Sequence, residues 1–157
     1  MGQVFIFLSL KIFMQIGVVG AGICDKKTYE LAYRVGQLIA ERGHILINGG
    51  LGGVMEASAK GAKSRNGLVV GILPDGKEQC NRYVDIRIAT YMGHARNIVI
   101  VHSSDALISV GGEYGTISEI AIALKEGKKV ASLEPPVILK GVKVCRTPEE
   151  ALEYVEG

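Results

Sequence analysis

The chain has 157 residues, of which 48% are apolar and 22% are charged, and it carries a formal net charge of +2. This size and apolar content predict one compact domain and exclude a disordered chain. The 21 glycines follow no three-residue repeat, which excludes a collagen-like chain. The small basic excess is scattered along the sequence, so neither nucleic acid nor a membrane surface is expected as a partner.

Three cysteines, Cys24, Cys80 and Cys145, lie far apart, and an odd number of them cannot form a complete set of intramolecular disulfides. We therefore expect a cytoplasmic location. The histidines and cysteines show no His-x-x-x-His or Cys-x-x-Cys spacing, so no metal site is expected.

Residues 1–13 are strongly apolar, but Lys11 interrupts the run, and neither a basic start nor a small-residue cleavage site is present. The segment is also too short to span a bilayer. We interpret it as an apolar leader or an extra strand, and we expect residues 14–157 to form a single Rossmann-like nucleotide-binding domain.

From residue 14 onward, short apolar runs alternate with segments of helical spacing. Five runs are apolar throughout, as expected of strands buried on both faces: 16–19, 45–47, 68–72, 106–110 and 130–133. Helical spacing is shown by three groups: Leu31, Val35, Leu38 and Ile39; Met55, Ala59 and Ala62; and Ile117, Ile120, Ala121 and Leu124. A last helix is predicted over 148–155, with Thr147 as its N-cap. The fold class is therefore α/β: a doubly wound, mostly parallel sheet with helices on both faces.

In such folds, ligands bind in the loops that follow the strands, and the first two of these loops are rich in glycine. Gly20 and Gly22 begin like a dinucleotide fingerprint, but Asp25 occupies the third glycine position. The next strand ends in Asn48, where a ribose-binding acid is expected, so we exclude an NAD cofactor. Asn48, Gly49 and Gly50 open a loop whose backbone could approach a ligand closely, or whose glycines could serve only a tight turn.

The segment 71–78 has the glycine and lysine spacing of a P-loop but ends in Glu78 instead of a serine or threonine. Without that hydroxyl, the magnesium ligand of a nucleoside triphosphatase is missing. We expect no bound cofactor in this protein.

The third loop follows the predicted strand 106–110 and contains Gly111, Gly112, Gly115 and Thr116. Glycines between a buried strand and a helix leave backbone amides free to bind an anion, so this loop predicts a phosphate site. Glu119 follows about one turn into the helix and could act on a group attached to that phosphate. Alternatively, Thr116 and Glu119 form a capping box, for which Thr-x-x-Glu is the signature.

These segments resemble the LONELY GUY family of nucleoside 5'-monophosphate phosphoribohydrolases. The resemblance is carried by Gly-Gly-x-Tyr-Gly-Thr-x-x-Glu, by the upstream segment 92–96, and by Asn48-Gly49-Gly50. Within the wider superfamily, the chain is most similar to the branch of molybdenum-cofactor carrier proteins and relatives of the DNA-processing protein.

The resemblance implies a Rossmann-like fold, a homodimer or larger homo-oligomer, and a phosphate held by Gly112, Gly115 and Thr116. It also implies that Arg96 and Glu119 act at an N-glycosidic bond. The chain departs from the enzymes at three positions, where Gly111 replaces a proline, Glu113 a glycine and Asn97 a lysine.

Cleavage of an N-glycosidic bond places positive charge on the ribose, which a carboxylate such as Glu119 could stabilise. Arg96 could hold the phosphate or orient Glu119, or it could be a solvated helix residue. His94 is expected to be structural. The sequence thus predicts a protein that binds a phosphorylated nucleotide, with phosphoribohydrolase as one activity. The alternative is a carrier or sensor of a phosphorylated nucleotide or pterin cofactor.

Overall fold

The computed structural model describes residues 13–157. In this part of the chain, seven strands form one sheet in the order β4-β3-β2-β1-β5-β6-β7, and all neighbouring strands pair in parallel. The strands are β1 Gln15–Gly20, β2 Ile45–Asn48, β3 Leu68–Leu73, β4 Ile86–Ala89, β5 Ala106–Val110, β6 Lys129–Leu133 and β7 Lys143–Cys145. The predicted parallel α/β sheet is confirmed, and its pairing is parallel throughout.

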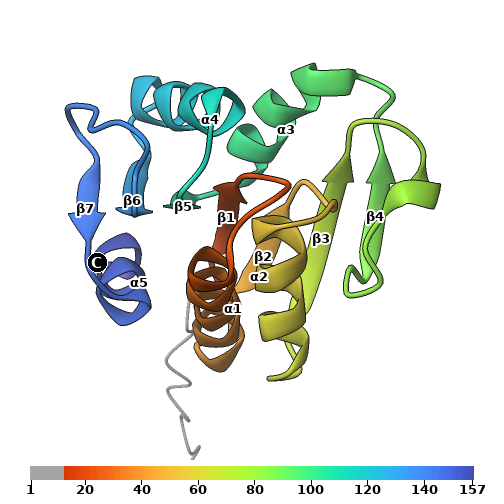
Figure 1. Ribbon diagram of the computed structural model, residues 1–157, viewed down its shortest axis with the longest axis horizontal. Helices are drawn as coiled ribbons and strands as arrows, with labels where there is room; N and C mark the ends of the chain where they lie inside the picture. The colour runs from red at the N-terminus through yellow and green to blue at the C-terminus, as the bar shows by residue number, and fades with distance from the viewer. Residues whose placement is uncertain (1–12) are drawn as a thin grey trace, which may run out of the picture.

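Five α-helices of the described residues cover both faces of this sheet (Figure 1). They are α1 Lys26–Glu41, α2 Val54–Lys63, α3 Arg96–Ser103, α4 Tyr114–Lys125 and α5 Pro148–Glu156. The helices α1, α2 and α5 pack against one face, and α3 and α4 pack against the other. Two short 3₁₀ turns, η1 Lys77–Gln79 and η2 Gly93–Ala95, lie in the connections.

Each face of the sheet has its own hydrophobic core, because successive side chains of a strand point to opposite faces. Along β1, Ile16 and Val18 belong to the core beneath α1, α2 and α5, whereas Val19 belongs to the core beneath α3 and α4. All five residues of β5 are buried. This two-sided burial explains why the central strands are apolar throughout instead of alternating.

The chain winds in two directions from the centre of the sheet. It passes from β1 outward through β2 and β3 to β4, and then returns so that β5 pairs with the other side of β1. The loops after β1 and β5 therefore diverge and leave a crevice at their carboxyl ends. In open α/β sheets this reversal point is the usual position of a ligand site.

Capping residues fix where two of the helices begin. At α1, the Asp25 carboxylate accepts a hydrogen bond of 2.8 Å from the backbone N–H of Thr28. At α5, the Thr147 hydroxyl accepts one of 3.2 Å from the Glu150 N–H, and Pro148 is the first helical residue. The predicted start of α5 is thus confirmed.

The helices α1 and α2 pack closely against each other at two glycines. A Cβ atom on Gly36 would lie 1.9 Å from the carbonyl oxygen of Ser58, and one on Gly61 would lie 1.9 Å from that of Tyr33. Backbone atoms of the two helices therefore meet where a side chain would keep them apart.

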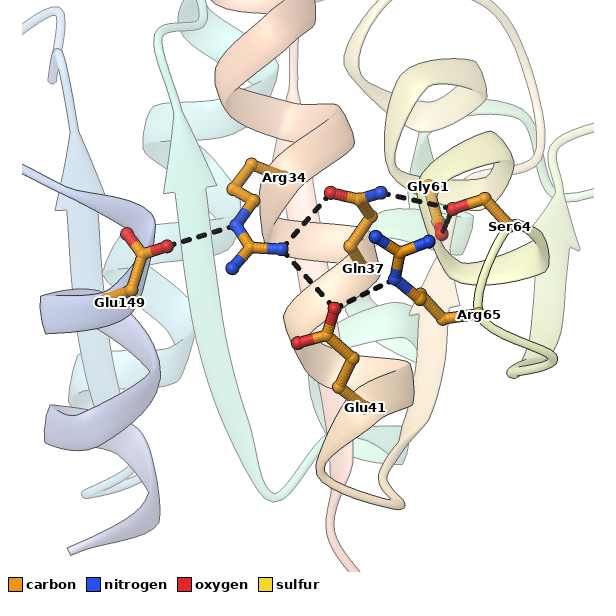
Figure 2. A network of polar contacts seen from close by, with 7 residues as sticks. All are labelled: Arg34, Gln37, Glu41, Gly61, Ser64, Arg65 and Glu149. Carbon is orange, nitrogen blue, oxygen red and sulfur yellow. Dashed lines mark hydrogen bonds and ion pairs between the residues drawn. The ribbon is translucent and has the colours of Figure 1, made fainter.

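At the surface, a polar network joins α1 to its neighbouring helices (Figure 2). Arg34 Nε contacts Glu149 of α5 at 3.0 Å, and Arg34 Nη1 contacts Glu41 at 3.4 Å. Glu41 also accepts a hydrogen bond of 2.9 Å from Arg65 Nε, beyond the end of α2. Because these side chains are partly exposed, water screens each pair, and its contribution to the stability of the fold is small.

The five predicted strands are all present, but β4, β7 and α3 were not expected. Ala121, expected on the apolar face of its helix, is exposed. The leader or extra strand expected over 1–13 lies, apart from Phe13, outside the described residues. Within residues 13–157, no helix is both long enough and apolar enough to cross a membrane.

Candidate functional site

A cavity of about 250 Å³ lies at the carboxyl ends of β1 and β5, where the strand order reverses. Loops that are far apart in the sequence meet there, together with the start of α3 and the first turns of α4. Seven of the residues predicted from the sequence are in its wall: Gly20, Gly22, Gly49, Arg96, Gly115, Thr116 and Glu119. The three glycine loops predicted from the sequence therefore border one site.

Four other predicted residues are not part of the cavity wall: Asn48, Gly50, Gly111 and Gly112. Asn48 is fully buried, and its amide donates to the carbonyl of Met55 at 2.9 Å while its Oδ1 accepts from the Gly50 N–H at 2.9 Å. These bonds hold the loop between β2 and α2. Gly50 has a φ of +76°, which supports the tight-turn interpretation of this glycine.

The first turn of α4 presents backbone amides to the cavity. Glu113 is the N-cap residue and has extended backbone, and its side chain makes no capping hydrogen bond to the helix. The first N–H groups of a helix have no partner within the helix and carry partial positive charge. Gly115 and Thr116, the second and third helical residues, place these groups at the cavity wall.

The alternative that Thr116 and Glu119 form a capping box is wrong. In a capping box the threonine is the N-cap, but here Thr116 lies inside the helix and Glu113 is the N-cap. Gly112, with a φ of +116°, makes room for Thr116, because a Cβ on Gly112 would lie only 2.4 Å from the Thr116 hydroxyl oxygen. Gly112 therefore acts by positioning the turn.

Glu119 is a buried carboxylate at the cavity, with 6% of its surface exposed. Burial raises the pKa of this carboxyl group from 4.5 to about 7, although the positive charge of Arg96 acts in the opposite direction. Within residues 13–157, no hydrogen bond to its side chain is found. A carboxyl group that titrates near neutral pH can both donate and accept a proton, which is typical of functional sites.

Arg96 is 8% exposed, so the alternative that it is a solvated helix residue is wrong. Its Nε donates to the carbonyl of Ile72 at 2.8 Å, and its Nη2 donates to that of Gly49 at 3.4 Å. Nη1 donates to the side-chain oxygen of Asn97. The guanidinium thus joins the ends of β2 and β3 to α3, which leaves it little freedom to follow a ligand.

The positive charge of Arg96 nevertheless affects the electrostatics of the cavity. Burial lowers the pKa of the guanidinium, and the nearby carboxylates of Glu119 and Asp75 oppose this effect. An arginine remains protonated under such conditions, so the cavity has a fixed positive charge in its wall.

The remaining residues of the cavity wall were not predicted from the sequence, and the polar ones among them are His94, Asn97 and Glu113. Asn97 is buried beside Arg96, whereas His94 is exposed on the turn η2 before α3. Two signals for Asn97 were available in the sequence: its position directly after Arg96, and its replacement of the lysine found in the resembling enzymes. No group of three or more metal-ligating side chains is found in the described part of the chain.

Comparison with solved structures supports the same fold over nearly the whole chain. The molybdenum cofactor binding protein of Rippkaea orientalis is 39% identical, with a TM-score of 0.85 over 90% of this chain and 94% of that protein. The molybdenum cofactor carrier protein of Chlamydomonas reinhardtii is 35% identical, with a TM-score of 0.84 over 91% and 96% of the two chains. The DNA processing protein A of Streptococcus pneumoniae, at 18% identity and a TM-score of 0.74, shares the fold alone.

Two proteins are related to this chain by sequence, and they align with it over different shares of their own length. An uncharacterized protein of Archaeoglobus fulgidus is 76% identical over 141 residues, which are 90% of this chain and 93% of the relative. A probable cytokinin riboside 5'-monophosphate phosphoribohydrolase of Oryza sativa subsp. japonica is 32% identical over 64% of this chain but only 43% of its own length.

The model of the SLOG cluster4 family matches residues 13–154. The chain therefore belongs to the SLOG cluster4 family, in the LOG-like superfamily indicated by its glycine motif.

Proposed function

We propose that this protein binds a phosphorylated pterin cofactor of the molybdenum-cofactor type in the cavity, and that it carries this ligand without changing it. The observation that carries the proposal is the uncapped first turn of α4, which borders a cavity that also contains a buried arginine. Free helix N–H groups together with a fixed positive charge favour an anionic group such as a phosphate.

Two features of the chain support a carrier. The molybdenum cofactor binding and carrier proteins align with it over almost their whole length, at 39% and 35% identity. In addition, Arg96 is bonded to two backbone carbonyls and to Asn97. A guanidinium used in this way stabilises the walls of a binding site and has few donors left for a reacting group.

Glu119 supports a second candidate function, the hydrolysis of nucleoside monophosphates at the N-glycosidic bond. Its carboxyl group lines the cavity, and its pKa of about 7 suits a group that exchanges protons at neutral pH. Ionised Glu119 would stabilise positive charge on a ribose or activate water. The rice relative named as a probable phosphoribohydrolase also supports this activity, although the chain spans less than half of that protein.

One experiment distinguishes the two functions. The protein is purified without added ligand, small molecules released on unfolding are identified by mass spectrometry, and the protein is then incubated for hours with a panel of nucleoside monophosphates. A carrier yields a co-purifying phosphorylated pterin and no free base. Release of a base and ribose 5-phosphate contradicts the carrier function. The hydrolase is then established if Glu119→Gln reduces turnover by at least ~10²-fold.

The expectations about other partners stay predictions. We propose that the protein forms a homo-oligomer and binds no nucleic acid. Light scattering after gel filtration measures the first, and a titration with labelled single-stranded DNA measures the second. A monomer, or DNA binding that persists at physiological salt, would contradict them.

A further inference from the structure

Asn97 has a side-chain amide whose orientation is fixed by its neighbour. The residue is 8% exposed and lines the cavity. Its Oδ1 accepts a hydrogen bond from Nη1 of Arg96. A guanidinium has donors only, so the oxygen of the amide must face Arg96 and the nitrogen must face away from it. The usual ambiguity between the two ends of an asparagine amide therefore does not arise here.

The amide nitrogen of Asn97 borders the open cavity. No acceptor bonds to Nδ2 within residues 13–157, although every fully buried polar side-chain atom in that range has a partner. Nδ2 thus reaches space that a ligand could enter. Its two N–H groups are donors, and an unused donor in a mostly buried site favours a ligand that supplies an acceptor.

Nδ2 also lies beside the first turn of α4. The point where a Cβ on Gly115 would stand is 3.7 Å from Nδ2 and is free of closer atoms. Asn97 therefore lies beside Gly115, and both residues line the cavity together with Thr116. Donor groups of α3 and of the first turn of α4 thus border one cavity, as an anion site requires.

We propose that Asn97 is a ligand-binding residue whose Nδ2 donates to an anionic oxygen of a phosphoryl group held at the α4 terminus. This inference rests on the proposed function and adds to it the residue that completes the phosphate site. Arg96 acts as a positioning residue, because it holds the Asn97 oxygen and so directs the nitrogen toward the ligand. The site thereby selects ligands with acceptor oxygens at this point and disfavours ligands that present donors there.

If Asn97 had a purely structural role, Asn97→Asp would have a different effect on ligand affinity. Aspartate keeps an oxygen for Arg96, and the pair becomes charged, so the contact with Arg96 survives. The nitrogen, however, is replaced by a second carboxylate oxygen, which repels a phosphate. If Asn97 serves only to hold Arg96, the aspartate variant keeps its affinity for a phosphorylated ligand.

The test is calorimetric titration of AMP and of adenosine into the wild-type protein, Asn97→Asp, Asn97→Ala and the control Asn66→Asp. Asn66 is exposed in the turn after α2, so its replacement adds the same charge away from the cavity. We expect wild type to prefer AMP over adenosine. We expect Asn97→Asp to weaken AMP binding by ~10²-fold, Asn97→Ala by about tenfold, and Asn66→Asp by less than about twofold.

Two results would overturn the inference, and they are distinguishable. If wild type binds AMP no more tightly than adenosine, the phosphate site itself is wrong, and the inference fails with it. If wild type prefers AMP and Asn97→Asp keeps that preference, Asn97 has only a structural role and the proposed site stands. Thermal unfolding of each variant shows whether it is folded, and Asn97→Ala decides the matter if the aspartate variant does not fold.

Discussion

Replacing Glu119 by Gln is expected to stabilise the protein at alkaline pH while removing a functional group. The carboxyl group has a pKa of about 7 in the folded protein and an ordinary value of 4.5. Because burial disfavours its charged form, folding favours the protonated form. The folded state therefore binds more protons than the unfolded state between these two pH values, and stability falls as the pH rises through this range.

The size of the effect follows from the pKa values. A rise of the pKa from 4.5 to about 7 corresponds to about 3 kcal/mol of stability, present below pH 4.5 and lost by about pH 8. Gln is neutral at every pH and resembles protonated Glu119 in shape. We expect Glu119→Gln to be as stable as wild type at pH 4.5 and up to about 3 kcal/mol more stable at pH 8.

Urea unfolding at pH 4.5, 6 and 8, followed by circular dichroism, measures the difference between the two proteins. Their free energies of unfolding should diverge as the pH rises. If the difference is constant over this range, or if the variant is less stable at pH 8, then the carboxyl group of Glu119 has its ordinary pKa in the folded protein. The electrostatic description of the cavity is then wrong. Glu153→Gln, on the exposed face of α5, is the control and should show no such divergence.

Three further predictions concern ligand binding, helix packing and the surface network. Gly115→Val should keep the fold, since a Cβ there has its nearest neighbour at 3.7 Å, yet weaken AMP binding at least about tenfold in calorimetry because the side chain covers the helix amides. Gly61→Ala should cost about 3 kcal/mol and lower Tm by about 10 °C in calorimetric scans, because the new Cβ meets a backbone oxygen at 1.9 Å. An increase in Tm, as expected for alanine in an ordinary helix, would contradict this close packing. Glu41→Gln should lower the urea midpoint only slightly, and less at high salt, because water and salt screen its ion pairs with Arg34 and Arg65. A large fall in the midpoint would give the network of Figure 2 a greater role in stability than its exposure predicts.

The central strands could be predicted from the sequence because burial on both faces requires continuous apolar runs. The edge strand β4 is different, since Ile86, Arg87 and Ile88 are all exposed, and burial therefore imposes no continuous apolar run on it. β7 has only three residues, too few to show a pattern. The short helix α3 contains the run 98–101 of β-branched residues, which is more typical of a strand than of a helix.

The site could be predicted only in part, for a similar reason. Glycine loops after parallel strands indicate where the backbone approaches a ligand, and the loops containing Gly20, Gly49 and Gly115 do meet at one cavity. The sequence does not indicate which way a polar side chain points. Asn48 turns inward to hold its own loop, whereas Asn97 borders the cavity because Arg96 fixes its amide. The orientation of Asn97 depends in turn on Arg96, whose guanidinium is held by the carbonyls of Ile72 and Gly49, far away in the chain.

The proposed function requires that a phosphate binds at the first turn of α4. A crystal structure of the protein with AMP tests this claim directly. We predict a phosphate whose oxygens lie about 2.7–3.2 Å from the backbone nitrogens of Gly115 and Thr116 and from Asn97 Nδ2. A phosphate that binds elsewhere while the amides of α4 contact only solvent would contradict the claim.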